Sequence, residues 1–399
     1  MPYSKYCYPL AAGAPEREVT LSDRPTPVGG QLRAAPPDRL PEVVAEHLRR
    51  EYAADRVEVL IGDLTLTGLW PLLDPTGPAG NTLALRCLGS QRPVIDIAPD
   101  VSSAYLPLTI WGERLGVLIL RTSLLPGPEL TDELSAIADE LALALRAADL
   151  VTDRYRQAGR RQRLTMAAEL QWELLPGRSL GDSRFLVAGQ LQPAYAVFGD
   201  HFDWTLIGDR LTLTVLNGHG DGLDAAVLTT VAVNAMRNAR RSGANIVEQA
   251  ELASDAVYAR YGGAAHAATL LLEIDLVGGR VEAVDAGSPR AVIAREREIR
   301  PVTLEQQLPL GMFGETRYET QRFLLAPADR LLVVSDGVHA ATPTGRAPYG
   351  ESALLTALRR TRLQPATEAV GTVMRGLREY HAGADPDDDA VAVCFDWRR

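Results

Sequence analysis

The chain has 399 residues, which at a usual domain size of roughly 100–200 residues predicts two or three domains. Its hydrophobic fraction of 46% and charged fraction of 23% are typical of a globular protein in which each domain buries a core. The net charge of −10 argues against a nucleic-acid scaffold, and three widely separated cysteines exclude a disulfide framework or a zinc site. We find neither a signal-peptide pattern nor an apolar run of the roughly 18 residues that a membrane helix needs, so the cytoplasm is the expected location.

The first part of the chain shows a leader followed by helix and strand patterns. Residues 1–38 are rich in Pro, Gly and Arg without periodicity, which predicts a flexible leader. From Leu40 onward, apolar residues recur at the spacing of an amphipathic helix. Strand candidates follow at Arg56–Gly62, Leu64–Trp70, Thr82–Leu88 and Val94–Ile97. The run from Ala104 to Leu120 predicts a hairpin at the edge of a sheet, with its turn at Gly112-Glu113.

This hairpin, with Pro107-Leu108 before the turn and Leu115-Gly116-Val117-Leu118 after it, resembles the last hairpin of a GAF domain. The resemblance implies a GAF-like α/β sensor over residues 39–130; such domains often bind small ligands or signal through dimers. We interpret Trp70 and Trp111 as core residues, with pocket lining as the alternative.

Residues 131–176 form a long helical pattern without an internal proline. Thr131 resembles an N-cap, and Pro176-Gly177 ends the pattern. Its apolar positions include Leu134, Ile137, Leu141 and Leu145 at helical spacing. This length predicts a signalling linker or a coiled coil through which a homodimer forms. Two separate helices packed on their own domains are the alternative.

Residues 177–399 alternate between strand and helix patterns. Strands are expected at Phe185–Gln192, Phe202–Ile207, Arg210–Leu216, Ala268–Asp275, Arg280–Ala286, Ala291–Ala294, Glu319–Leu325, Arg330–Val334 and Ala390–Phe395. Helices are expected at Leu223–Arg241, Ile246–Tyr261, Glu351–Arg359 and Ala366–Ala382. Short turns between several strands favour an α+β domain of antiparallel sheets flanked by helices.

Acidic residues fall at the ends of these strands. They are Asp200 before one strand, Asp336 after another, and Asp387-Asp388-Asp389 before the last. Each alone is typical of a turn or cap, but several carboxylates beside buried strands need a cation or hydrogen bonds to compensate them. Oxygen ligands of this kind suit Mg²⁺ or Mn²⁺.

A glycine-rich loop, Asn217-Gly218-His219-Gly220-Asp221-Gly222, joins a strand to an Ala-rich helix. Glycines let a backbone approach a ligand closely, which makes this loop a candidate for holding an ion. A connection that merely needs positive φ angles is the alternative.

The order of motifs resembles a PPM-type metal-dependent Ser/Thr phosphatase, and more narrowly its bacterial SpoIIE/RsbU-like branch. The motifs are Gly199-Asp200, Asn217-Gly218-His219-Gly220, Leu223-Asp224-Ala225-Ala226, Ala286-Gly287-Ser288-Pro289, Leu308-Pro309-Leu310-Gly311, Ser335-Asp336-Gly337 and Asp388-Asp389, with Glu169–Pro176 as the helical entry. The resemblance implies an α-β-β-α sandwich of two antiparallel sheets flanked by helices.

The resemblance also implies the roles of individual residues. Asp200, Asp336 and Asp388 match carboxylate ligands of the metals, and Gly218 matches a backbone carbonyl ligand. Asn217 stands where the family has the aspartate that bridges two metals, and an amide offers one neutral oxygen in place of two anionic ones. We expect His219, Asp221 and Asp389 to support these ligands, and we interpret His201, His266 and His339 as exposed or hydrogen-bonded histidines.

The expected function is therefore that of a regulatory phosphatase, controlled by the sensor through the linker and the helix after Gly222. Its implied substrate is a phosphoprotein such as an anti-sigma-factor antagonist, and its implied cofactors are Mg²⁺ or Mn²⁺. The family has two metal sites, and Asn217 leaves one site or none as alternatives here. Two other classes stay open: a pseudophosphatase that acts as a binding module, and a purely structural scaffold. We expect no nucleic-acid and no membrane partner.

Overall fold

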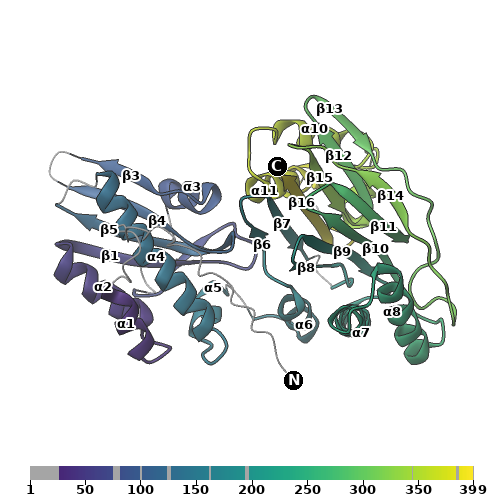
Figure 1. The fold of residues 1–399 in the computed structure, drawn as a ribbon, viewed down its shortest axis with the longest axis horizontal. Helices are drawn as coiled ribbons and strands as arrows, with labels where there is room; N and C mark the ends of the chain where they lie inside the picture. Colours follow the sequence, from purple (N-terminus) through teal and green to yellow (C-terminus); the bar gives the residue numbers. More distant parts are fainter. Residues whose placement is uncertain are drawn as a thin grey trace, which may run out of the picture.

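The structure is a computed structural model that describes residues 27–74, 81–98, 101–123, 127–160, 163–193, 197–343, 345–382 and 386–398. Most of the predicted leader, residues 1–26, lies outside the described residues. Figure 1 shows one sheet with its helices on the left and two facing sheets with their helices on the right. No helix within the described residues combines the length and the apolarity that a bilayer crossing requires.

The first sheet has five antiparallel strands in the order β2-β1-β5-β4-β3. Its strands are β1 (Ala54–Gly62), β2 (Leu69–Pro71), β3 (Val94–Ile97), β4 (Ser102–Ile110) and β5 (Glu113–Thr122). One face packs on α1 (Pro27–Ala34), α2 (Leu40–Glu51) and α4 (Pro128–Ala148), and the other packs on α3 (Thr82–Ser90). The helix predicted from Leu40 is confirmed.

Several predictions for this part of the chain are wrong. Thr82–Leu88 lies in helix α3 and not in a strand, because the Asn81 side chain caps the helix by accepting a hydrogen bond from the Ala84 amide at 2.9 Å. The hairpin β4–β5 exists, but it occupies the centre of the sheet and not its edge. The end of the predicted leader is helix α1, which is ordered because Val28 and Leu32 are buried against the core.

Trp111 is 75% exposed at the hairpin turn, so its interpretation as a core residue is wrong, whereas Trp70 is partly buried. The turn contacts the rest of the chain through its backbone. The Gly181 amide donates to the Trp111 carbonyl at 2.7 Å, and the Ser179 hydroxyl donates to the Gly112 carbonyl at 2.7 Å. Gly181 and Ser179 belong to β6 (Ser179–Gly181), so the hairpin is joined directly to the second half of the molecule.

The predicted continuous helix over 131–176 is wrong. The described residues of this segment form three helices, α4, α5 (Arg154–Gly159) and α6 (Met166–Leu174). The apolar positions Leu134, Ile137 and Leu141 are fully buried against the first sheet of the same chain, so they are not available as the seam of a coiled-coil dimer. Helix α5 packs on β1 and β2 of the first sheet, whereas α6 packs on α7 (Gly222–Arg241).

The remaining strands form two antiparallel sheets that face each other. One sheet has the order β14-β11-β10-β9-β8 and the other β13-β12-β15-β16-β7-β6. The strands are β7 (Phe185–Gln192), β8 (His201–Ile207), β9 (Arg210–Gly218), β10 (Ala267–Asp275), β11 (Arg280–Ala286), β12 (Arg290–Arg295), β13 (Glu298–Pro301), β14 (Gln321–Leu324), β15 (Arg330–Val334) and β16 (Ala390–Trp397). All nine strand predictions for this domain are confirmed within a few residues, and among its described residues only the short β6 and β13 were not predicted.

Helices cover the outer faces of the two sheets. Helix α7 and α8 (Ile246–Tyr261) pack on the first of them, and α10 (Ala353–Arg360) and α11 (Ala366–His381) pack on the second. Between the sheets lies a core that includes Phe185, Phe202 and Phe395, each at most 1% exposed. The predicted α-β-β-α sandwich is confirmed, and Figure 1 shows its four layers.

Candidate metal centre

The predicted site residues come from four segments of the sandwich. Asp200 immediately precedes β8, and Asn217 lies near the end of the adjacent strand β9. Asp336 begins the short helix α9 (Asp336–His339) directly after β15, and Asp388 lies two residues before β16, which pairs with β15. The direct contacts and mutual electrostatic effects described below place the side chains of these residues at one end of the sandwich.

Asp200 is a fully buried carboxylate. Neither of its oxygens makes a hydrogen bond of good geometry within the described residues. The pKa of Asp200 is raised well above its usual range, first by burial and then by the charges of Asp388 and Asp336; the nearby Ser335 hydroxyl opposes this only in part. A buried carboxylate without a partner needs either a proton or a cation.

The pKa of Asp388 is raised as well. Burial, and next the charge of Asp336, raise the pKa of Asp388 to about 7. One of its oxygens accepts a hydrogen bond from the Asp389 amide at 2.8 Å. Asp200, Asp336 and Asp388 therefore repel one another at short range, and a divalent cation is the ion that best offsets such a set of oxygens.

Asn217 makes direct contact with Asp336. The amide nitrogen of Asn217 donates a hydrogen bond to Oδ1 of Asp336, and the same oxygen accepts from the Gly337 amide at 3.1 Å. Asn217 thus supplies Asp336 with a positive dipole and not with a second carboxylate. Within the part of the chain that the structure describes, no three His, Cys, Asp or Glu side chains are arranged around one point as ligands of a metal. The carboxylates of Asp200, Asp336 and Asp388 fit a cation in their negative charge and their oxygen donors. Asn217 adds no negative charge to this set.

Two glycines allow the backbone to pass close to the carboxylates. Gly337 has no room for a side chain, because a Cβ there would lie 1.8 Å from the carbonyl oxygen of Asp389. Gly199 has φ +89°, a conformation that glycine adopts without strain. The Gly199 carbonyl accepts from the Gly218 amide at 3.3 Å and from the Thr229 hydroxyl at 2.7 Å. These bonds fix the backbone of the glycine-rich loop beside Asp200.

The three residues predicted to support the ligands differ in position. His219 is exposed and lies against the ring of His266, with centroids 4.9 Å apart. Asp221 is exposed and makes no side-chain capping bond as the N-cap of α7. Asp389 is fully buried, and its Oδ2 accepts from the Phe198 amide at 2.8 Å. Of the three, only Asp389 is built into the structure behind the carboxylates.

His339 and His201 were both predicted to be exposed or hydrogen-bonded, and the structure separates them. The ring of His339 donates to the Ser288 carbonyl at 2.9 Å, as predicted for a hydrogen-bonded histidine. His201 is fully buried, and neither ring nitrogen makes a hydrogen bond of good geometry among the described residues, so its prediction as exposed or satisfied is wrong. Burial lowers the pKa of His201 to about 4, which keeps the ring neutral in the core.

Gln171 is a site residue that the sequence analysis missed. It is 2% exposed on α6, and its amide donates to the Asp200 carbonyl at 2.9 Å and to Oδ2 of Asp389 at 2.8 Å. A polar residue between Leu170 and Leu174 on the apolar side of a helix was the available signal. Gln171 connects the helix that enters the sandwich to two of the acidic segments.

Comparisons with known proteins concern the fold of the domain that carries these residues. Residues 207–398 match the family model described as Stage II sporulation protein E (SpoIIE). The solved SiaA-PP2C domain of Pseudomonas aeruginosa is similar with a TM-score of 0.51 and 19% identity, over 58% of this chain and 94% of that domain, which shows the same fold.

Two further structures match over less than two thirds of their own length. The PP2C phosphatase domain and regulatory-domain fragment of SpoIIE from Bacillus subtilis matches at TM-score 0.47 and 18% identity, over 54% of this chain and 64% of that one. The RsbU and RsbW domains of a Mycobacterium tuberculosis protein match at a TM-score of 0.46 and 22% identity, over 54% of this chain and 62% of that one. The SpoIIE family match and the sandwich fold together show that residues 207–398 of this chain form a SpoIIE-like domain with the fold of the PP2C domains.

Proposed function

We propose that the protein is a metal-dependent regulatory phosphatase that hydrolyses phosphoserine or phosphothreonine on a regulatory protein, such as an anti-sigma-factor antagonist. The observation that carries the proposal is Asp200: a fully buried carboxylate without a good hydrogen bond, facing the charges of Asp336 and Asp388 in a SpoIIE-like domain. Such a residue destabilises the fold unless a cation binds beside it.

Asp200, Asp336, Asp388 and the Gly218 carbonyl would hold Mg²⁺ or Mn²⁺. When bound, the ions would supply a water acidified toward pKa ~7 and positive charge for the phosphoryl oxygens. The protein's own contribution is to keep the carboxylates ionised and in place. Gln171 holds the Asp200 backbone, and Gly337 lets Asp336 approach the β16 segment.

We further propose that residues 39–130 act as a GAF-like sensor for this domain. The five-stranded sheet with helices on both faces supports a separate folding unit, and its hairpin contacts β6 through Gly181 and Ser179. The packing of α5 on the first sheet and of α6 on α7 supports a connection from sensor to phosphatase between these two helices. Helix α6 carries Gln171, so a displacement of α6 would act on the carboxylates.

A second candidate function is that of a pseudophosphatase that binds a phosphoprotein without turning it over. The hydrogen bond from Asn217 to Asp336 favours it, since Asp336 is already satisfied by an amide in the absence of metal. Loss of one anionic ligand weakens the affinity for a pair of divalent cations.

The test is phosphate release from a phosphoserine protein with Mg²⁺ or Mn²⁺, compared among the wild type, Asp336→Asn and Asp209→Asn. Asp209 is the matched control, because it is an exposed aspartate paired with Arg184 in the turn between β8 and β9. The proposal predicts activity that requires a divalent metal, is lost in Asp336→Asn and is kept in Asp209→Asn. A wild type that is inert with both metals, yet binds the phosphoprotein, would favour the second candidate.

A further inference from the structure

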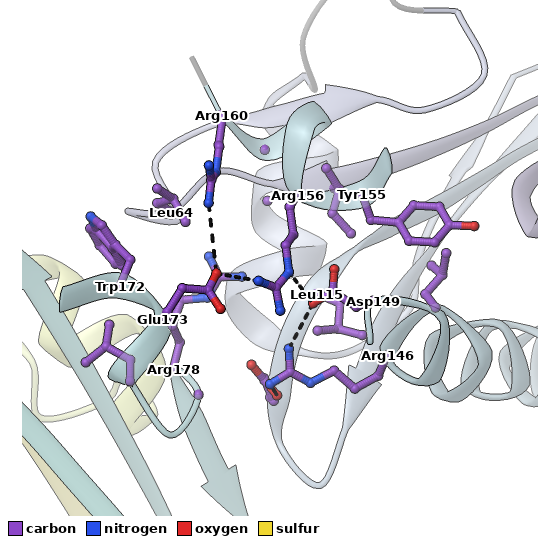
Figure 2. A pocket seen from close by; sticks show the side chains of 17 residues that line it. Leu64, Leu115, Arg146, Asp149, Tyr155, Arg156, Arg160, Trp172, Glu173 and Arg178 are labelled. Carbon is purple, nitrogen blue, oxygen red and sulfur yellow. Dashed lines mark hydrogen bonds and ion pairs between the residues drawn. The ribbon is translucent and has the colours of Figure 1, made fainter. Parts of the chain in front are cut away.

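A pocket lies between the two halves of the molecule, away from the metal centre. It has a volume of about 210 Å³ and is lined by the first sheet, by α4, α5 and α6, and by the segment before β6. Figure 2 shows Trp172, Glu173 and Arg178 on one side of this pocket and Arg156 near its middle. Such a volume exceeds that of a few waters and is suited to a small ligand.

The lining of this interdomain pocket is strongly charged. It contains four arginines, Arg146, Arg156, Arg160 and Arg178, and three carboxylates, Glu113, Asp149 and Glu173. The excess of arginine contrasts with the net charge of −10 of the whole chain. A positive pocket in an acidic protein attracts anions to one place.

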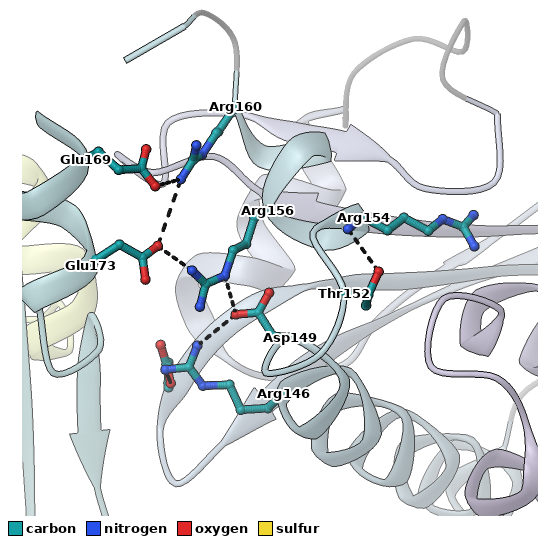
Figure 3. A network of polar contacts seen from close by, with 9 residues as sticks. Arg146, Asp149, Thr152, Arg154, Arg156, Arg160, Glu169 and Glu173 are labelled. Atoms are coloured by element: carbon teal, nitrogen blue, oxygen red, sulfur yellow. Dashed lines mark hydrogen bonds and ion pairs between the residues drawn. The ribbon is translucent and has the colours of Figure 1, made fainter. Parts of the chain in front are cut away.

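Most of these charges form a chain of ion pairs, which Figure 3 shows. Asp149 lies 3.7 Å from Arg146 and 3.3 Å from Arg156, and Glu173 contacts Arg156 and lies 3.9 Å from Arg160. Arg160 also pairs with Glu169 at 2.6 Å. The chain joins α4 and α5 to α6, and its members are partly exposed, so each pair contributes little to stability and can be exchanged for another anion.

Arg178 has no such partner. Among the described residues it forms no ion pair with a carboxylate, and its guanidinium donates instead to the backbone carbonyl of Asp63. Burial lowers the pKa of Arg178, and the charges of Glu113 and Asp63 compensate this only in part. The guanidinium of Arg178 therefore faces the pocket with spare hydrogen-bonding capacity.

A second arginine lies behind Arg178. Arg114 is only 7% exposed, its Nε makes no hydrogen bond, and it forms no ion pair within the described part of the chain. It lines a small adjoining cavity that shares Leu64, Trp172 and Arg178 with the pocket. Burial and then the charge of Arg178 lower the pKa of Arg114, so the two guanidinium groups are close enough to repel each other. The charge of Glu368 opposes this effect on Arg114 only in part. Two like charges at such close range, neither of them in an ion pair among the described residues, are stabilised by an anion bound between or beside them.

We propose that the interdomain pocket binds a small phosphate-bearing metabolite, with its phosphate on Arg178 and with Arg146 and Arg156 at the pocket wall. A phosphate monoester carries about −1.5 to −2 charges at neutral pH, enough to offset both Arg178 and Arg114. The planar guanidinium binds phosphate oxygens in pairs. Trp172 and Leu64 supply apolar surface for the remainder of the ligand.

Binding there would act on α6. A phosphate that takes Arg156 competes with Glu173, and Glu173 follows Gln171 on the same helix by two residues. The pocket is thus placed to alter the contact between α6 and the acidic segments. The binding itself does not depend on whether the metal centre turns over.

The experiment measures binding to the metal-free, full-length protein in EDTA by calorimetry, so that phosphate cannot bind to metal ions at the other site. The probes are inorganic phosphate, AMP and adenosine. The variants are Arg178→Gln and Arg146→Gln. Arg322→Gln is the matched control, because Arg322 on β14 is exposed and paired with Glu282 on β11.

We expect AMP or inorganic phosphate to bind, adenosine to fail, and Arg178→Gln to weaken the affinity at least about tenfold, the loss of one charge-assisted contact. Arg322→Gln should bind as the wild type does. If Arg178→Gln does not fold, the affinity of Arg146→Gln for the phosphate probes becomes the test. The Arg146 side chain is 45% exposed and tolerates substitution. Failure of both phosphate probes to bind, or unchanged affinity in the folded pocket variants, would overturn the proposal.

Discussion

Replacement of Asn217 by Asp is the most informative single change in this protein. In the structure the Asn217 amide donates to Oδ1 of Asp336, a hydrogen bond to a charged group that contributes about 1.5–3 kcal/mol. Asn217→Asp removes this donor and places two carboxylates in contact. The change therefore separates two effects of Asn217. One is the hydrogen bond with which it stabilises the metal-free fold, and the other is its lack of a carboxylate that could bind a metal.

The expected cost follows from the contact. Two unit charges about 4 Å apart repel by about 4 kcal/mol at an effective dielectric constant of 20, and less where both are partly exposed, as here. Together with the lost hydrogen bond, we expect Asn217→Asp to lower the free energy of unfolding by about 2–4 kcal/mol in EDTA. For a domain of this size that corresponds to roughly 5–15 °C in melting temperature.

Divalent metal should reverse this loss. The new carboxylate adds an anionic ligand beside Asp336, so Mn²⁺ should raise the melting temperature of Asn217→Asp by more than it raises that of the wild type. The assay is thermal unfolding in EDTA and in Mn²⁺, with Asn217→Ala as the control. The alanine variant loses the hydrogen bond without gaining a charge, so it should be mildly destabilised and show no added response to metal.

Two results would refute this reasoning. If Asn217→Asp is as stable as the wild type in EDTA, the amide is not a partner of Asp336. If Mn²⁺ stabilises both proteins equally, the position of Asn217 does not contribute to the metal site, and the departure from the family at this residue carries no functional meaning.

Three further predictions concern residues around the site and in the sensor. Gly337→Ala should destabilise the sandwich by about 3 kcal/mol and abolish any metal response, because its Cβ would meet the Asp389 carbonyl; chemical unfolding with and without Mn²⁺ tests this. Gln171→Leu should cost about 1–3 kcal/mol, since it deprives Asp389 of a buried donor, and urea unfolding measures it. His47 is 2% exposed, and burial lowers its pKa below the unfolded value of about 6.5, so stability should be constant above that pH and fall as the pH drops through it; His47→Leu should abolish this part of the pH dependence in melting curves from pH 8 to 5.

The sandwich could be predicted from the sequence because its signals are local and repeated. Strands such as Phe185–Gln192 and Arg280–Ala286 are apolar runs bounded by turn residues, and the structure gives them the predicted limits. The glycine-rich loop and the acidic segments also follow one another in a particular order along the chain. This combined order, more than any single motif, predicts the fold.

The first half of the chain was harder because its signals depend on packing. Thr82–Leu88 is apolar enough for a strand, yet the Asn81 cap and the surface of the sheet make it a helix. The pattern over 131–176 has helical periodicity throughout, but a sequence does not show where a helix leaves one domain for the next. The break lies where α5 packs on the first sheet and α6 on α7.

The candidate site also contains residues that the sequence predicts and residues that only the contacts in the fold reveal. Residue types placed Asp200, Asp336 and Asp388 at strand ends, and in the fold burial and mutual repulsion raise the pKa values of Asp200 and Asp388. The sequence did not indicate that Gln171, from the entering helix, would hold Asp200 and Asp389 together, because that bond spans up to 218 positions. Nor did it indicate that Arg114 and Arg178 would lie close enough to repel each other, with neither in an ion pair among the described residues. Helix α6 takes part in both features, because it carries Gln171 and also Trp172, which lines the cavities beside Arg178 and Arg114. A displacement of α6 would therefore change both sets of contacts.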